Sequence, residues 1–197
     1  MDASHGPDDL TLAKLARDGS SAAFGILVRR YHARVFAFLH TLTKHRQDAE
    51  DLTQETFMRA WDKFHRYDPS LPLLPWLFTL ARRQSIAALR RLKPLPPELP
   101  DSDTAEPTHA ALRLWELARR DLPPETYSAL WLHYCEELPL KQVAGILGKR
   151  EGAVKVMLHR ARKTLAERFR GGGSPPPPLI EVQPPPLPLS EPQSTLP

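Results

Sequence analysis

Clusters of proline constrain this chain more than any other feature of its sequence. Four prolines fall within the nine residues 93–101, and ten of the 22 prolines lie in residues 171–197. Proline lacks a backbone hydrogen-bond donor and interrupts helices and central strands, so neither segment can supply a packed core. The sequence therefore predicts a linker over 93–107 and a disordered tail over 171–197, which leaves two small domains over 8–92 and 108–170.

Apolar residues in both predicted domains recur at three- and four-residue spacing, which is the period of a buried helix face. One such stripe is Phe57, Ala60, Trp61 and Phe64, which we expect to be buried. No stretch alternates with the period of two that a half-buried strand requires. The predicted fold class is all-α, with a helical bundle before the linker and a helix-turn-helix unit after it.

The most distinctive local pattern lies in the second domain. A short apolar segment, 140–147, is followed by Gly148 and then by a basic helix that should start near Glu151. Residues 149–170 carry eight basic and two acidic side chains. The small Ala144, the turn glycine and the basic second helix together favour a DNA-binding helix-turn-helix. The alternative is a plain helical hairpin with a solvated basic face.

An acidic segment interrupts the otherwise basic first domain. Asp48, Asp51 and Glu55 share one helical face because they are three and four residues apart, and Gln54 lies beside them. Such carboxylates can simply favour the start of a helix through its dipole, or they can hold a metal ion. No second ligand set of a known metal-binding spacing accompanies them. We therefore interpret this face as a docking surface for a basic protein partner.

Residues 64–91 combine aromatic side chains, a proline-rich loop and a group of polar residues dominated by arginine. The residues concerned are His65, Tyr67, Trp76, Arg82, Arg83, Gln84, Arg90 and Arg91. Arginines for phosphates beside a loop for an unstacked base are what recognition of a single nucleic-acid strand requires. The aromatic residues fit a hydrophobic core equally well, and their spacing leaves both interpretations open.

The chain shows no pattern that would support catalysis. His133 and Cys135 are two residues apart, which places them on different faces of a helix, and no nucleophile-elbow sequence is present. The single cysteine can form no internal disulfide, and no cysteine–histidine ladder indicates zinc. No run of about 18 apolar residues and no signal-peptide pattern occurs. We expect a non-enzymatic cytoplasmic protein that uses no metal and no cofactor.

Taken in order, these segments resemble the sigma factors of bacterial RNA polymerase, specifically the small two-domain extracytoplasmic-function (ECF) group. Segments 23–31, 48–57 and 75–82 look like sigma region two, and segments 122–124, 143–144, 147–148, 154–155 and 158–161 look like sigma region four. The acidic run and the basic run are each fairly specific, and their order and spacing strengthen the resemblance.

The resemblance implies a function and its partners. A sigma factor binds core RNA polymerase, directs it to promoters, helps to melt the DNA, and is usually controlled by an anti-sigma factor. Region two would dock on the clamp helices of the largest polymerase subunit, and region four would meet the flap of the second-largest subunit. The residues implied in core binding are Asp48, Asp51, Leu52, Gln54, Glu55 and Phe57.

Promoter DNA, both duplex and melted, is the other implied partner. The loop from Arg66 to Pro75 and the helix after it would bind the minus-ten element through Arg66, Tyr67, Trp76, Arg82, Arg83 and Arg90. The basic helix would enter the major groove of the minus-thirty-five element. The residues implied there are Lys149, Arg150, Glu151, Ala153, Lys155, Val156, His159, Arg160 and Lys163.

Six positions depart from the usual family pattern, namely Arg83, Ala87, Tyr127, Ala153, Val156 and Met157. The lost polar groups at the last three predict either a different sequence preference or a weaker reliance on the minus-thirty-five element.

Two other functions remain open at this point. The chain would be a free-standing helix-turn-helix regulator if the acidic face bound no polymerase. It would be a polymerase-binding decoy if promoter reading had been lost.

Overall fold

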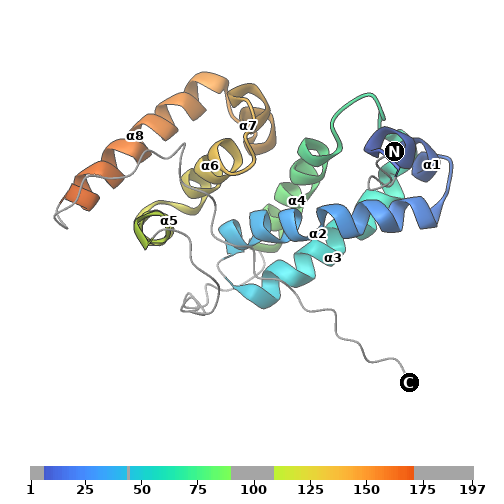
Figure 1. The fold of residues 1–197 in the computed structure, drawn as a ribbon, viewed down its shortest axis with the longest axis horizontal. Coiled ribbons are helices and arrows are strands. Elements are labelled where there is room, and N and C mark those ends of the chain that lie inside the picture. Colours follow the sequence, from blue (N-terminus) through green and yellow to red (C-terminus); the bar gives the residue numbers. More distant parts are fainter. Residues whose placement is uncertain (1–6, 44, 90–108, 171–197) are drawn as a thin grey trace, which may run out of the picture.

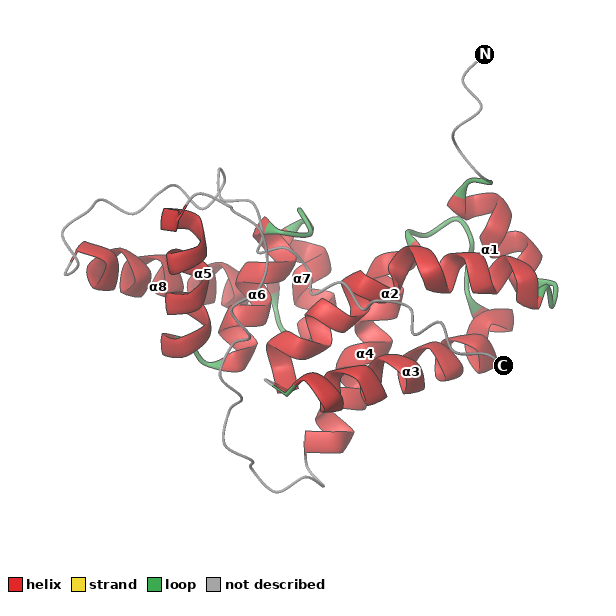
Figure 2. Cartoon of the chain, turned by 60° about the horizontal axis from the view of Figure 1, so that its bottom comes forward, coloured by secondary structure: helices red, strands yellow, loops and turns green. Residues whose placement is uncertain are grey.

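The computed structural model describes residues 7–43, 45–89 and 109–170, and every regular element in these ranges is a helix (Figure 1, Figure 2). The prediction of an all-α fold is confirmed. The elements are α1 (Asp9–Arg17), α2 (Ser21–Thr43), α3 (Arg46–Lys63), the short 3₁₀ helix η1 (Phe64–Arg66), α4 (Leu73–Leu89), α5 (His109–Asp121), α6 (Pro124–Tyr134), α7 (Leu140–Leu147) and α8 (Glu151–Arg170). The predicted linker 93–107, the predicted tail 171–197 and Arg90 lie outside the described residues.

The helices α1 to α4 pack into one bundle around the long α2 (Figure 1). Asp8 caps α1, because its carboxylate accepts a hydrogen bond from the Thr11 amide at 2.6 Å, and this bond holds the pKa of Asp8 below its ordinary value. Asp9 then accepts hydrogen bonds from Arg30 and Tyr31, which fixes α1 against α2.

The acidic helix begins earlier than Asp48, where the sequence placed its start. It begins at Arg46 because side chains four residues apart support its first turn. Arg46 forms an ion pair with Glu50 at 2.9 Å, and Gln47 donates a hydrogen bond to Asp51 at 3.1 Å. The earlier start adds half a turn before the acidic face and leaves the spacing of that face unchanged.

The second domain contains the helix-turn-helix that the sequence predicted, formed by α7 and α8. Gly148 ends α7 in the left-handed conformation, with φ of 62°, and its amide donates hydrogen bonds to the Ala144 and Gly145 carbonyls. Val154, Leu158, Ala161 and Leu165 lie buried along the inner side of α8. Small and apolar residues thus fix the angle at which α8 leaves the turn.

The two domains contact each other directly, with α6 packed on α2 and α7 packed on α4 (Figure 1). Trp131 of α6 lies against two phenylalanines of the first domain, with ring centroids 6.2 Å from Phe38 and 5.8 Å from Phe78. All three side chains are buried. The sequence predicted two separate domains and gave no indication of this contact. Among the described residues, no helix has both the length and the apolar character needed to cross a membrane.

The turn of the helix-turn-helix can be tested with two glycines. Gly148→Ala should lower the free energy of unfolding by about 1 kcal/mol, because a Cβ is disfavoured at positive φ. Gly145→Ala should instead raise it by about 0.5–1 kcal/mol, because Gly145 is an exposed helical residue with open space around its Cα. Urea unfolding followed by circular dichroism measures both effects. Equal shifts for the two variants would contradict the assigned turn.

Candidate functional site

The acidic residues of α3 form an outward surface. Asp51 and Gln54 are exposed, and Glu55 is 44% exposed and forms an ion pair with Arg59 at 2.7 Å. Asp48 is partly exposed. Among the described residues, no group of three or more potential metal ligands is found. The surface is therefore a set of carboxylates held in place by the helix, which suits contact with a cationic partner.

Two residues implied in core binding are buried rather than exposed. Leu52 is 5% and Phe57 6% exposed, and the Phe57 ring stacks on His32 of α2 at 6.1 Å between centroids. Their side chains hold α3 against the bundle, so they position the acidic surface from behind.

Two exposed apolar residues that the sequence pattern did not assign to the acidic surface extend it. Met58 is 70% and Trp61 37% exposed. We expected Trp61 in the buried stripe, and this was wrong in part, since one side of its ring packs on Phe24 at 5.0 Å while the rest is in solvent. The sequence did contain a signal for this placement. Met58 and Trp61 follow Gln54 by four and seven residues, so they lie on the same side of the helix as Gln54.

The aromatic residues after α3 form a cluster that shapes the loop before α4. Tyr67 is 4% exposed, and its ring lies 5.3 Å from Phe64 and 4.9 Å from Trp76. The Tyr67 hydroxyl donates a hydrogen bond to the Leu71 carbonyl across the loop. The sequence left open whether these aromatic residues pack in the core or stack on a nucleic-acid base. Tyr67 packs in the core, whereas the ring of Trp76 remains partly exposed.

The loop itself is folded by a polar residue and borders a hollow. Asp68 accepts hydrogen bonds from the amide and the hydroxyl of Ser70 at 3.0 and 2.8 Å, which hold the pKa of Asp68 below its ordinary value. The hollow beside the loop has a volume of about 330 Å³ and includes Tyr31, Tyr67 and the exposed Leu10 and Leu71. An aromatic and apolar hollow of this size suits a planar ring.

The arginines of the first domain face different directions. Arg66 is exposed beside His65, and Arg83 is exposed on a groove of about 360 Å³ between α3 and α4 that Arg59 and Lys63 also line. Arg82 is only 14% exposed because it points into the second domain. The predicted DNA-binding arginines are thus not brought together on one surface.

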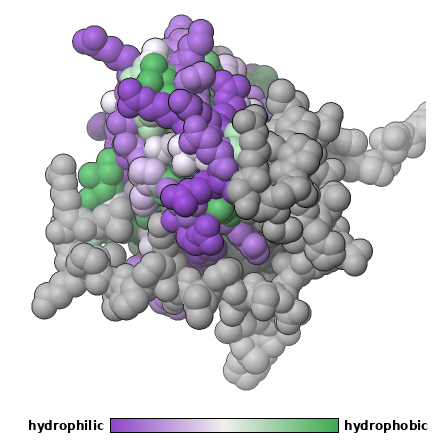
Figure 3. Space-filling view, turned by 90° about the vertical axis from the view of Figure 1, so that its left-hand side faces the viewer, coloured by the Kyte–Doolittle hydropathy of each residue, from purple (hydrophilic) through white to green (hydrophobic). Residues whose placement is uncertain are grey.

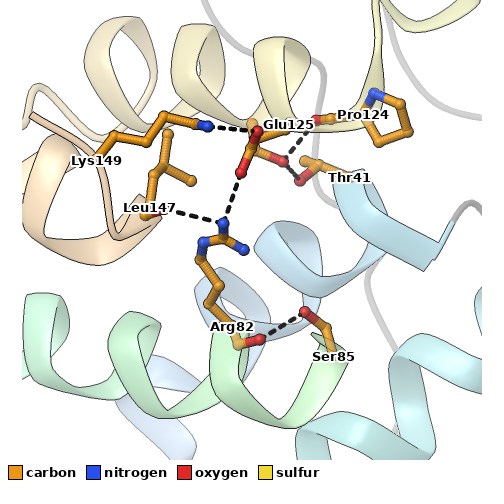
Figure 4. Close-up of polar contacts among 8 residues, drawn as sticks. Thr41, Arg82, Ser85, Pro124, Glu125, Leu147 and Lys149 are labelled. Carbon is orange, nitrogen blue, oxygen red and sulfur yellow. Dashed lines mark hydrogen bonds and ion pairs between the residues drawn. The ribbon is translucent and has the colours of Figure 1, made fainter. Parts of the chain in front are cut away.

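Arg82 is bound by the second domain at two points (Figure 4). Its guanidinium donates hydrogen bonds to the Glu125 carboxylate at 2.6 Å and to the Leu147 carbonyl at the end of α7 at 2.9 Å. The other oxygen of the same carboxylate forms an ion pair with the ammonium group of Lys149, and the two atoms lie 2.9 Å apart. Glu125 therefore neutralises one candidate DNA-binding cation from each domain.

The outer side of α8 is exposed and mainly polar. Apart from Lys149, every residue implied in minus-thirty-five binding is exposed, namely Arg150, Glu151, Ala153, Lys155, Val156, His159, Arg160 and Lys163. The surface is mostly hydrophilic when seen from the side of the molecule where α8 lies (Figure 3). Ala153 and Val156 present only methyl groups on this side, whereas Met157 is partly buried.

Comparisons with known proteins match both domains to families. Residues 27–94 match Sigma-70 region 2, and residues 115–165 match Sigma-70 region 4. The chain is 34% identical over 156 residues to the ECF RNA polymerase sigma factor SigM of Bacillus subtilis, a similarity that covers 74% of this chain and 94% of that protein.

Two solved structures have similar folds. CnrH, in complex with the cytosolic domain of CnrY, superposes with a TM-score of 0.62 at 26% identity over 84% of this chain and 99% of that one. The sigma factor RpoE from Bartonella quintana, in complex with the anti-sigma factor NepR, superposes with a TM-score of 0.60 at 22% identity over 75% of this chain and 96% of that one.

The buried phenol in the loop predicts how stability changes at alkaline pH. Burial, with Asp68 and Asp9 nearby, raises the pKa of Tyr67 from 10.0 to about 12. Between these values the unfolded chain loses the proton while the folded chain keeps it, so the free energy of unfolding should fall as pH rises. Tyr67→Phe should show a smaller fall than the parent protein in urea unfolding at pH 9 and 11. An equal fall in both proteins would contradict this prediction.

Proposed function

Because the chain belongs to the ECF sigma factors of bacterial RNA polymerase, we propose that its exposed α3 surface binds core polymerase and that α4 and α8 read the promoter. Sigma factors bind core RNA polymerase and direct promoter recognition, DNA melting and initiation. The observation that supports the assignment of sites is the presence, on one chain, of an exposed acidic surface on α3 and a separate basic helix-turn-helix. A free-standing DNA-binding regulator would have no use for the former.

The core-binding surface we propose consists of Asp48, Asp51, Gln54 and Glu55, joined by Met58 and Trp61. Carboxylates give attraction to a cationic partner and set its orientation, while the exposed apolar pair supplies area that is buried on binding. Leu52 and Phe57 would act indirectly by holding α3 in place. This division of roles separates contact residues from supporting residues within one helix.

For the minus-ten element we propose that a base of the melted strand enters the hollow beside the loop 67–73. The aromatic and apolar residues that line that hollow would pack on the base, the partly exposed Trp76 would offer a separate stacking surface, and Arg66 and Arg83 would bind phosphates. Tyr67 would fix the loop. Arg82, bound to Glu125 in this structure, could join the DNA contacts only after the second domain moves away.

For the minus-thirty-five element we propose that the exposed side of α8 enters the major groove. Lys155, Arg160 and Lys163 would bind phosphates or base edges, and Ala153 and Val156 could offer only apolar contact, as to a thymine methyl group. The protein would therefore recognise its preferred DNA sequence more through apolar contacts than through bidentate hydrogen bonds.

We further propose that an anti-sigma factor controls the chain, and that the protein works in the cytoplasm as a dissociable, non-enzymatic subunit. The support is the family itself and the likeness in fold to the sigma factor that is complexed with NepR. Co-purification of a stoichiometric partner that blocks polymerase binding would test the first part.

Run-off transcription tests the proposed function as a whole. Core polymerase and this protein, incubated with genomic DNA, should give discrete starts that share two upstream elements. The methyl groups at positions 153 and 156 favour one other candidate, a polymerase-binding decoy. Core binding without transcripts would support the decoy, and no core binding would overturn both.

The core-binding surface can be tested by charge reversal. Asp51→Arg with Glu55→Arg should weaken core binding by about tenfold or more, because two attractive contacts become repulsive. Asp18→Arg with Glu116→Arg makes the same charge change at exposed positions elsewhere and should leave binding unchanged. Fluorescence titration of labelled protein with core polymerase measures both. Equal weakening by both pairs would indicate a non-specific charge effect.

The DNA-binding side of α8 can be tested through salt dependence. Each phosphate contact that is lost should reduce the slope of log K against log salt by about 0.9, so Lys155→Ala with Arg160→Ala should reduce it by roughly 2. Lys14→Ala with Arg17→Ala removes two exposed charges from α1 and should leave the slope unchanged. Fluorescence anisotropy with promoter duplex between 50 and 200 mM salt (roughly the range over which such slopes are read) gives the measurement. An unchanged slope for the α8 pair would exclude these residues.

A further inference from the structure

The groove between α3 and α4 gathers three cationic side chains. Arg59 and Lys63 line it from α3, and Arg83 lines it from α4. Arg59 forms an ion pair at 2.7 Å with Glu55, which also lines the groove. Lys63 and Arg83 form no ion pair and no hydrogen bond within the part of the chain that the structure describes. The groove therefore carries a net positive charge, and two of its cations are available to an anion.

The Gln84 side chain is buried at the bottom of the same groove. It is 7% exposed, and its carboxamide makes no hydrogen bond to any residue that the structure describes. Buried polar groups almost always have a hydrogen-bond partner, because burial without one costs free energy. Gln84 lines the groove, so a partner can reach it from there. A groove occupant that hydrogen-bonds to Gln84 explains why a polar residue stands at this buried position.

The size and the walls of the groove fit a small ligand with an apolar part. Its volume of about 360 Å³ lies within the range of about 300–1,000 Å³ that small-ligand sites have. Leu80, Ala87 and Ala88 supply apolar surface from α4. Arg83 and Ala87 are two of the positions at which this chain departs from the usual family pattern, and both line the groove. The groove therefore owes part of its charge and shape to residues outside that pattern.

We propose that this groove binds an adenine nucleotide. Arg59, Lys63 and Arg83 hold the phosphates, because guanidinium and ammonium groups bind phosphate through charge-assisted hydrogen bonds. The adenine lies on the apolar wall, where the Gln84 carboxamide donates to N7 and accepts from the N6 amino group, which is the pairing that glutamine makes with adenine.

The nucleotide site goes beyond the proposed promoter reading and shares one residue with it. Arg83 is also assigned to a phosphate of the minus-ten strand, so a bound nucleotide competes with that strand for the same guanidinium. Glu55 belongs to the proposed core-binding surface and lines the groove from the other side. The ligand therefore lies between the surface proposed for polymerase and the one proposed for DNA.

Calorimetric titration of the whole chain with ATP tests the site. We expect one ATP per chain, and binding at least tenfold weaker after Lys63→Ala with Arg83→Ala. Lys14→Ala with Arg17→Ala removes the same two side-chain types from exposed positions on α1 and should leave binding unchanged. The absence of ATP binding by the parent protein, or equal weakening by both pairs, would overturn the proposal.

The role of Gln84 is tested by the choice of nucleotide. ATP should bind about fivefold or more tightly than CTP, and inorganic triphosphate should bind more weakly than ATP. Gln84→Leu should bring ATP and CTP to equal affinity. It should not lower the midpoint of urea unfolding, because the carboxamide that it removes has no partner among the described residues.

Two results of these measurements would contradict the proposal. Inorganic triphosphate that binds as tightly as ATP would show a groove that attracts any polyanion. A Gln84→Leu protein that unfolds at lower urea would show that the carboxamide serves the fold and not a ligand.

The same variants separate this site from the DNA-binding surface. If Lys63 and Arg83 serve DNA alone, their removal weakens the binding of promoter DNA while the parent protein binds no ATP, and the proposal is overturned. Failure of the promoter-reading roles would leave the ATP titration unchanged, because neither DNA nor polymerase takes part in it.

Discussion

Trp131 packs against Phe38 and Phe78, whose ring centroids lie 4.9 Å apart, and through this contact the interiors of the two domains become continuous. Each domain is small, and small domains bury a modest share of their surface when they stand alone. Sharing an aromatic centre adds buried area to both. The same contact sets the distance and angle between the helix-turn-helix and the first bundle, so it also sets which cations are paired across the two domains, namely Arg82 and Lys149 with Glu125.

Glu125 links this packing to function. It stands at the start of α6, where a carboxylate is favoured by the helix dipole, and from there it reaches Arg82 of one domain and Lys149 of the other. The acidic residues of α3 remain exposed or partly exposed while this contact is made. The α3 surface and the Arg82–Glu125–Lys149 contact therefore lie under different structural constraints, since only the second depends on how the domains pack.

Burial separates residues that the family pattern groups together. In the acidic run, Asp51 and Gln54 face solvent, whereas Leu52 and Phe57 pack inward, because a helix turns by about 100° per residue. At the loop before α4, Tyr67 is buried and hydrogen-bonded, while Trp76 remains partly exposed. A motif read along the chain therefore contains both contact residues and the residues that position them.

Residue spacing was enough to predict the all-α class, the helix-turn-helix with its turn at Gly148, and the acidic surface of α3, because each follows from patterns within a few turns of chain. Other features could be learned only from the folded chain, namely the partial exposure of Trp61, the separate directions of Arg66, Arg82 and Arg83, and the packing of one domain on the other. These depend on contacts such as Arg82 with Glu125, whose partners are far apart in sequence. The periodicity of apolar residues indicates which side of a helix is buried, but it does not indicate which element covers that side.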